Sequence, residues 1–392
     1  MPRPPNILFI LTDQLNARAL GATGHARAAT PNIDRTARRD VRFTRVHCVN
    51  LWQGWITQTG DRYGLPPNDT VPQSHHPMKS APDWQCLNPQ APWQGRDSQG
   101  YTIWRGEMWI LGGWFTPQTP NPRDVWHSAN GRDWTCATAE APWPHSDLPV
   151  TLAFRDRLWL MGGRRLPGKE NSNAVWSSAD GANWIQESPA AGWCPRVSAA
   201  HVVFQDRMWV LGGTENFYED NEHTLHNDVW CSANGRDWTC VTAHAPWSPR
   251  AHHQAVVFAN KIWIIGGGGR FPVTHTCNDV WCSADGLNWT QVTAAAEWVP
   301  RLWHSAVAWR DHLWVLGGIS QAIENLGDVW CSRDGQNWTQ LQSNVIWTPR
   351  HAQAVFALPD RLVLAAGHAN PVNSEVWSLE LPADFFADHP AG

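Results

Sequence analysis

The stretch Trp281–Gly318, WCSADGLNWTQVTAAAEWVPRLWHSAVAWRDHLWVLGG, decides the fold, because the chain repeats versions of it. A double-glycine step recurs every 49 to 54 residues, beginning at Gly112, Gly162, Gly212, Gly266 and Gly317 and weakened once to Ala366-Gly367. A Val-Trp pair recurs with it, its tryptophans being Trp126, Trp176, Trp230, Trp281, Trp330 and Trp377. Another tryptophan follows Asn or Asp at Trp84, Trp134, Trp184, Trp238, Trp289 and Trp338. The chain therefore contains six repeats.

Each repeat predicts four short strands. Segments such as CSADGLN and CSANGRD place Asp-Gly or Asn-Gly between two strand-like runs, and these dipeptides supply the positive φ angles of a tight hairpin turn. Runs such as DHLWVLGG read as buried strands that end where only glycine fits. One four-stranded sheet cannot bury both of its faces, whereas six sheets packed around an axis can. The sequence therefore predicts an all-β fold, a six-bladed β-propeller.

The double-glycine step and the paired aromatic positions resemble the kelch repeat, from about Trp84 to Trp377. One departure is that kelch repeats usually carry Tyr where this chain has Trp126, Trp230 or Trp281. The change affects packing rather than topology. The resemblance implies a scaffold on which binding surfaces are built.

The predicted propeller begins with the fourth strand of a blade, at Trp84, and its last repeat ends after a third strand, at Trp377. We therefore expect the N-terminal strand to complete the last blade. The competing interpretation takes Asp384-Phe385 as that fourth strand, but the Asp-Gly turn is missing there. The domains expected are an incomplete fragment over 1–65, a Pro-rich linker over 66–83, the propeller over 84–381 and a C-terminal tail over 382–392.

Composition limits the possible partners and the compartment. The 29 tryptophans fall mostly on repeat-locked positions, which predicts that they fill the core. The net charge of the chain is −5. Residues 1–48 have a charge of +5, so the remainder has −10, and this acidic charge disfavours nucleic acid as a partner. The nine cysteines show no CxxC or His/Cys metal spacing, and repeat-equivalent cysteines lie too far apart to bridge. We expect a monomer with reduced thiols, no cofactor and no membrane span, in the cytoplasm.

The N-terminal segment differs from the repeats. PNILFILTDQ, residues 5–14, reads as a buried strand ending in two oxygen ligands, and ATPNIDRTARRDVRFTRVHCVN follows at residues 29–50 as a helix and a second strand. This short α/β segment resembles the start of a sulfatase, a family in which the Asp and Gln at this strand end bind a divalent metal. The resemblance implies calcium at Asp13 and Gln14. The resemblance makes a sulfuric ester hydrolase the alternative function. The family's Cys/Ser-x-Pro-x-Arg nucleophile motif, however, is absent here.

Loop lengths indicate where the propeller can specialise. The distance from the first glycine of each double-glycine step to the next strand-three tryptophan varies between 11 and 18 residues, whereas the other spacings are fixed. The variable loops and the connections between blades lie on the same face. Arginine opens strand one in five blades, at Arg96, Arg196, Arg250, Arg301 and Arg350, with His253 and His304 three residues after Arg250 and Arg301.

We predict that these arginines and histidines ring the channel mouth and bind an anionic peptide, protein or small ligand without catalysis. The structural alternative is that each repeated arginine instead hydrogen-bonds the carbonyls of neighbouring loops. A second alternative function is a kelch-type sugar isomerase, in which His and Arg of the pore would act as acid and base.

Overall fold

In the computed structural model, the described residues are 76–218, 221 and 223–387, and they form strands β1–β27 without an α-helix. The chain divides into two units, Met1–Gln73 and Ser74–Gly392, and every described residue belongs to the second. The fragment predicted over 1–65, with Asp13 and Gln14, lies outside the described residues. Nothing in the described part has the helical length and apolarity needed to cross a membrane.

The first four blades are antiparallel sheets of consecutive strands. Blade one contains β3 (Gly100–Trp104), β4 (Glu107–Leu111), β5 (Val125–Ser128) and β6 (Thr135–Thr138). Blade two contains β7 (Val150–Phe154), β8 (Arg157–Met161), β9 (Val175–Ser178) and β10 (Trp184–Ser188). Blade three contains β11 (Ala200–Phe204), β12 (Arg207–Thr214), β13 (Leu225–Ser232) and β14 (Thr239–Thr242). Blade four contains β15 (Gln254–Phe258), β16 (Lys261–Gly269), β17 (His275–Ser283) and β18 (Trp289–Thr293).

The last two blades include strands from the N-terminal side of the propeller. Blade five contains β20 (Ser305–Trp309), β21 (His312–Leu316), β23 (Val329–Ser332), β24 (Thr339–Gln342) and, at its outer edge, β1 (Met78–Ser80). Blade six contains β25 (Ala354–Ala357), β26 (Arg361–Ala365), β27 (Val376–Glu380) and β2 (Gln85–Asn88). A short antiparallel pair joins β19 (Arg301–Leu302), which precedes blade five, to β22 (Ile319–Ser320), which lies between β21 and β23 in sequence.

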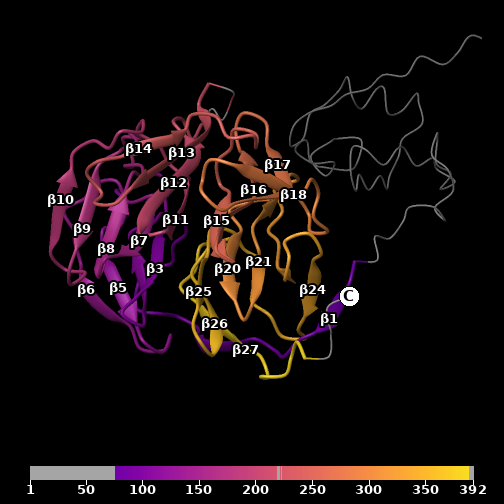
Figure 1. The fold of residues 1–392 in the computed structure, drawn as a ribbon. Helices are drawn as coiled ribbons and strands as arrows, with labels where there is room; N and C mark the ends of the chain where they lie inside the picture. Colours follow the sequence, from indigo (N-terminus) through magenta and orange to yellow (C-terminus); the bar gives the residue numbers. More distant parts are fainter. Residues whose placement is uncertain (1–75, 219–220, 222, 388–392) are drawn as a thin grey trace, which may run out of the picture. The chain divides into compact units, whose positions relative to one another are not determined.

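The six innermost strands, β3, β7, β11, β15, β20 and β25, contact one another in sequence, and β25 contacts β3 to close the ring (Figure 1). The six-bladed propeller predicted from the repeats is confirmed. Closure by the N-terminal strand is also confirmed, since β2 pairs antiparallel with β27 through Gln85–Ser378, Cys86–Trp377 and Asn88–Val376. Asp384 and Phe385 lie in a turn and not in a strand.

The end of the segment predicted as a linker, residues 66–83, contains a strand. Met78–Ser80 adds to the edge of blade five as β1, parallel to β24. Lys79 Nζ donates to the Phe385 carbonyl at 2.5 Å, and the Phe386 ring stacks on His312 with centroids 3.8 Å apart. The edge of blade five is therefore covered by segments from both ends of the described chain.

Tryptophans join neighbouring blades. The Trp in each blade-to-blade connection is buried and meets the strand-four Trp of the next blade nearly edge to face. Trp298, for example, is 5.9 Å from Trp338 at 87°, and Trp84, just before the closing strand β2, is 6.0 Å from Trp347 at 87°. Such aromatic pairs contribute about 0.5–1.5 kcal/mol beyond their buried area. The packing role predicted for the repeated tryptophans matches these contacts.

The Asp-Gly turns show why glycine recurs there. Gly286 has φ +74°, and a Cβ added to it would lie 2.2 Å from the ring of Trp209, which belongs to the preceding blade. Ser283 Oγ accepts the Gly286 N–H at 2.8 Å, while Asp285 Oδ1 accepts two further backbone N–H groups. These hydrogen bonds lower the pKa of Asp285 to about 2. The turn is thus fixed by its own side chains and packs against the preceding blade.

Gly286→Ala is expected to destabilise the propeller by roughly 2–4 kcal/mol, from left-handed strain added to overpacking against Trp209. The matched control is Gly106→Ala, because Gly106 has φ +78° and no atom within 4 Å of an added Cβ, so it reports the backbone strain alone. Thermal unfolding of both variants gives the measurement. Equal losses in the two variants would contradict the packing argument.

Candidate functional site

The five arginines predicted to ring the channel mouth lie inside the blades. All are at most 3% exposed, and four form two-pronged ion pairs with an Asp two residues before the strand-three Trp. Arg301 donates from Nη1 and Nη2 to Asp328 at 2.7 and 2.8 Å, from Nη1 to the Gly317 carbonyl at 2.9 Å and from Nε to the Val299 carbonyl at 2.9 Å. The equivalent pairs are Arg96–Asp124, Arg196–Asp228, Arg250–Asp279 and, with Glu in place of Asp, Arg350–Glu375.

The contacts of these arginines agree with the structural alternative. Burial raises the pKa of Asp328, but the Arg301 guanidinium and the Trp330 indole N–H outweigh it, so the pKa is lowered overall. Blade two has Ser146 at the arginine position and Ala174 at the acid position, so the pair is replaced as a unit. Because the guanidinium N–H groups of the five arginines donate to these acids and carbonyls, we do not propose the arginines as ligand contacts.

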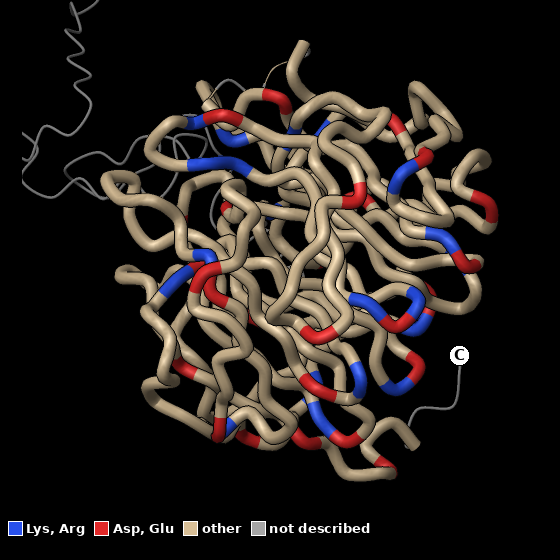
Figure 2. Tube along the Cα trace, turned by 90° about the vertical axis from the view of Figure 1, so that its left-hand side faces the viewer, with Lys and Arg blue, Asp and Glu red and all other residues tan. Residues whose placement is uncertain are grey.

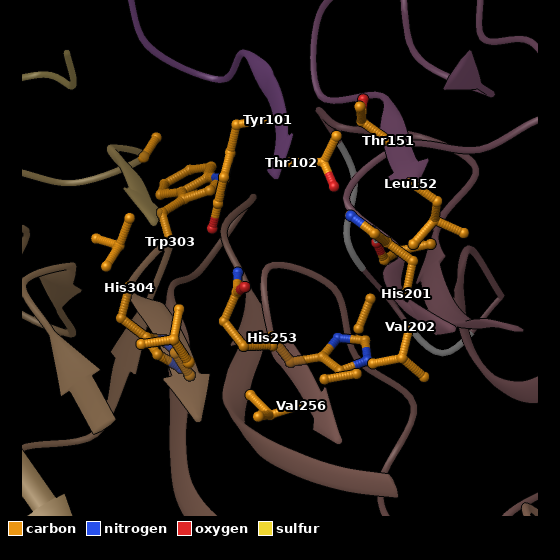
Figure 3. Close-up of a pocket in the computed structure, with 18 of the residues that line it drawn as sticks. Tyr101, Thr102, Thr151, Leu152, His201, Val202, His253, Val256, Trp303 and His304 are labelled. Atoms are coloured by element: carbon orange, nitrogen blue, oxygen red, sulfur yellow. Dashed lines mark hydrogen bonds between the residues drawn. The ribbon is translucent and has the colours of Figure 1, made fainter. Parts of the chain in front are cut away.

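His253 and His304 line an inner chamber on the propeller axis, a cavity of about 480 Å³. Figure 3 shows both beside Tyr101, Thr151 and His201 around this space. Both are buried, and neither ring makes a hydrogen bond of normal geometry to the described residues. Burial lowers the pKa of His304 to about 3, and the pKa of His253 lies well below its usual value for the same reason. The two imidazoles are therefore neutral at physiological pH.

A ring of backbone hydrogen bonds joins the six blades around the inner chamber. Six residues, each two positions after the residue that opens strand one, have left-handed φ of 50–59° and bond head to tail. Each N–H donates to the carbonyl of the equivalent residue in the preceding blade, at 2.8–3.4 Å. This backbone ring consists of Ser98, Leu148, Ser198, His252, Trp303 and Ala352, all of which line the inner chamber.

A second cavity, the mouth pocket, of about 390 Å³, shares Ser98, Leu148 and Trp303 with the backbone ring. Its aromatic side includes Phe217 and Phe271 from the two longest strand-two to strand-three loops, with Tyr218 beside Phe217. The face predicted to specialise from its loop lengths is the face that carries this pocket. Its remaining lining residues are Asp97, Trp114, Pro117, Asp147, Arg164, Arg270, Ile319, Ile323, Asn325, His351, His368 and Asn370.

Each blade supplies the mouth with one bridged residue pair. One partner follows the residue that opens strand one, the other follows the double-glycine step, and the two face each other across an antiparallel bridge. The pairs of blades three, four and five are apolar or small: Val197–Thr214, Ala251–Gly268 and Leu302–Ile319. The pairs of blades six, one and two contain charged, histidine or tryptophan side chains: His351–His368, Asp97–Trp114 and Asp147–Arg164. Among the bridged pairs, the charged residues and the histidines therefore lie in blades six, one and two.

Comparison with known proteins agrees with this architecture. Residues 98–318, more than half of the chain, match the KLHDC2/KLHL20/DRC7 Kelch-repeats domain. The chain belongs to the kelch-repeat family. An alignment of 115 positions, which covers 25% of the chain, is 32% identical to the dynein alpha chain of the flagellar outer arm from Chlamydomonas reinhardtii and spans 2% of that protein. The kelch resemblance is confirmed, whereas the sulfatase resemblance of residues 1–50 falls outside both the family match and the described residues and stays a prediction.

Two buried carboxylates, Asp97 and Asp147, lie at the mouth of this kelch propeller. Asp147 accepts from Arg164 Nε at 2.9 Å and Nη2 at 2.5 Å, and Asp97 lies 3.0 Å from His368 Nδ1. Burial raises the pKa of Asp147 to about 6, with a further increase from the charge of Asp97. Burial raises the pKa of Asp97 too, while its hydrogen bond raises the pKa of His368. Burial lowers the pKa of His351 to about 3.

None of these mouth residues was among the candidates from sequence. Asp97, Arg164, His351 and His368 are far apart in the chain, and no short motif links them. The available signal was a comparison of repeats at the two bridged positions, where blades six, one and two depart from the apolar or small residues of the other three.

Proposed function

We propose that this kelch propeller is a non-catalytic binding module that takes an anionic group of a peptide, protein or small ligand into the mouth pocket, beside an apolar group of the same ligand. The observation that carries the proposal is Arg164. Its side chain is 5% exposed, and Nε and Nη2 are held by Asp147, while Nη1 has no partner among the described residues. A buried guanidinium nitrogen without an acceptor is costly, and a carboxylate or phosphate of a ligand would satisfy it.

Aromatic rings supply the apolar half of the proposed site. The Arg164 guanidinium lies 4.1 Å from the centre of the Phe217 ring and 5.2 Å from that of Tyr218. Phe217 is in turn 5.8 Å from Phe271 and 6.1 Å from Trp303. Tyr218 is 42% exposed, so part of this aromatic cluster faces solvent. A few convergent polar groups in a concave, mostly apolar surface are typical of ligand sites.

The double variant Arg164→Met/Asp147→Leu is expected to weaken ligand binding while keeping the fold, because it removes a buried ion pair as a unit and leaves no uncompensated charge. Peptides selected from a random display library on the native protein would serve as probes, with their affinity measured by fluorescence polarisation. Loss of one charge-assisted hydrogen bond, about 1.5–3 kcal/mol, predicts a Kd roughly 10- to 150-fold higher. Phe217→Ala should weaken the same peptides by removing the apolar contact.

Arg155→Ala is the matched control, because Arg155 forms an equivalent ion pair with Asp206 that is exposed in the turn between β7 and β8, on the opposite face. It should leave the affinity unchanged. Selected peptides that bind the double variant and Phe217→Ala as tightly as the native protein would place the ligand elsewhere and overturn the proposal.

The remaining expectations about this protein are also proposals: a monomer in the cytoplasm that does not bind nucleic acid. Two observations support them. The described cysteines are all free thiols. In Figure 2 the positions of Lys and Arg along the described chain are interspersed with those of Asp and Glu, which does not favour nucleic acid as a partner.

The enzyme alternatives gain no specific observation. The lining of the inner chamber contains His253 and His304 and none of the five predicted arginines, so the described residues do not bring the acid and base of a sugar isomerase together in that cavity. The residues on which a sulfatase-like activity would depend, Asp13 and Gln14, lie outside the described part of the chain.

A further inference from the structure

Asp97, His351 and His368 converge where blade six meets blade one. Each offers a ligand atom, and these atoms all lie within 4.8 Å of one another. The separation between Asp97 Oδ2 and His368 Nδ1 is 3.0 Å. All three residues line the mouth pocket, so the cluster is open to a cavity on one side. Two imidazoles and one carboxylate form a donor set typical of zinc and other divalent transition metals.

The backbone places the two imidazoles side by side. His351 and His368 face each other across an antiparallel bridge and exchange hydrogen bonds, His351 N–H to the His368 carbonyl at 3.3 Å and His368 N–H to the His351 carbonyl at 2.9 Å. Directly opposed residues project their side chains from the same face. The two rings accordingly stack 4.9 Å apart at 22°. Asp97 is fixed in the same way, by its bridge to Trp114.

Further contacts orient the cluster as they do in metal sites. Asn325 Oδ1 is 2.6 Å from His351 Nδ1, so this nitrogen carries the proton and Nε2 keeps its lone pair. Asn325 Nδ2 donates to the His368 carbonyl at 2.8 Å, which ties one amide to both histidines. Trp114 stacks on the His368 ring at 5.9 Å. A hydrogen bond to the second nitrogen of a ligating imidazole fixes its tautomer and orientation.

We propose that Asp97, His351 and His368 bind one divalent transition-metal ion of the zinc class, with its remaining coordination position open to the mouth pocket. Donor atoms around tetrahedral zinc lie closer together than 4.8 Å, the upper limit of the distances between the ligand atoms of this cluster. Binding therefore requires only a small inward movement of the side chains. The carboxylates of Asp97 and Asp147 favour a cation at this place. Among the described guanidinium groups, Arg164 is paired with Asp147, whereas the charge of Arg270 acts on His351 and opposes a cation there. The metal site does not depend on the ligand proposed above.

The described residues contain a second group with the same spacing, Cys194, Glu215 and His226. There the guanidinium of Arg196 donates from Nη2 to Cys194 Sγ at 2.8 Å, which places a fixed positive charge against a would-be ligand. Burial also raises the pKa of the Cys194 thiol to about 11. We therefore do not propose metal binding at this group, but it supplies an internal control.

The test uses the full chain, stripped with a chelator and titrated with Co²⁺, whose visible absorption reports its ligands. We expect one Co²⁺ per chain with a band of nitrogen and oxygen coordination and without the thiolate charge-transfer band that Cys194 would produce. Zn²⁺ should displace it and raise the melting temperature in a concentration-dependent manner. His351→Asn and His368→Asn should each abolish the band, and His226→Ala should leave it unchanged.

Asn325→Ala keeps all three ligands and removes only their orienting partner, so it is informative even if a ligand variant folds poorly. Its Co²⁺ and Zn²⁺ affinities should fall roughly 10- to 100-fold. A native chain that binds no Co²⁺, a band that survives both histidine variants, or a thiolate band that disappears in Cys194→Ser would overturn the proposal. Because no peptide is present, this result is independent of whether the mouth pocket binds an anionic ligand.

Discussion

A chain that begins at Ala91 is expected to aggregate or to melt at a much lower temperature than one that begins at His76. The shorter chain lacks β2, so the outer backbone edge of β27 loses its partner in blade six and becomes available for pairing with other chains. It also lacks Trp84, which is 2% exposed and packs edge to face against Trp347. The closing strand thus contributes both hydrogen bonds and an interface between blades five and six.

Size-exclusion chromatography and calorimetry on the two chains give the measurement. A synthetic peptide of residues 78–90, added to the shorter chain, should restore part of the lost stability, since it supplies β1, Trp84 and β2 without a covalent connection. If the shorter chain stays monomeric and melts like the longer one, closure by β2 does not stabilise the propeller, and the C-terminal residues after β27 must substitute for it.

Arg301→Ala should destabilise the propeller by about 3–5 kcal/mol, the range found when one partner of a buried ion pair is removed. Asp328, whose side chain is 18% exposed, would keep its charge without the guanidinium, and the Gly317 carbonyl would lose its donor. Thermal and denaturant unfolding measure the loss. Arg155→Ala, which breaks an exposed pair, should change the melting temperature little.

The propeller itself suggests a second control. Arg301→Ser/Asp328→Ala gives blade five the residues that blade two has at these positions, Ser146 and Ala174. Because no charge is left unpaired, the double variant should be more stable than Arg301→Ala despite the additional substitution. A single variant that melts like the native protein, or a double variant less stable than the single, would show that the arginines do not act as structural ion pairs.

Repetition made the fold predictable from sequence. Six occurrences of one pattern place the strands, turns and glycines independently of any single residue, and the incomplete repeats at Trp84 and Trp377 indicate how the ring closes. The strand β1 was not predictable in this way, because Met78–Ser80 occurs once, within a Pro-rich segment, and pairs parallel with a strand more than 250 residues away.

The candidate site was harder to predict for a related reason. An arginine repeated at the start of strand one indicates a ligand only if no other residue of the repeat pairs with its guanidinium. Here an acidic residue two positions before the strand-three tryptophan recurs together with the arginine. The correlated loss of both residues in blade two was readable from sequence and pointed to a structural pair. The mouth residues differ from blade to blade, so they emerge only when equivalent positions are compared and the topology brings blades six, one and two together.

The backbone ring described above has no first or last member. Each of its six hydrogen bonds joins two blades, and none can form within a single repeat. In an open solenoid, a terminal repeat has one neighbour and frays first. Here every blade has two neighbours and takes part in two ring bonds. Opening any one blade therefore breaks two of the six bonds. We therefore expect the propeller to unfold as one cooperative unit, although its sequence is an array of similar repeats.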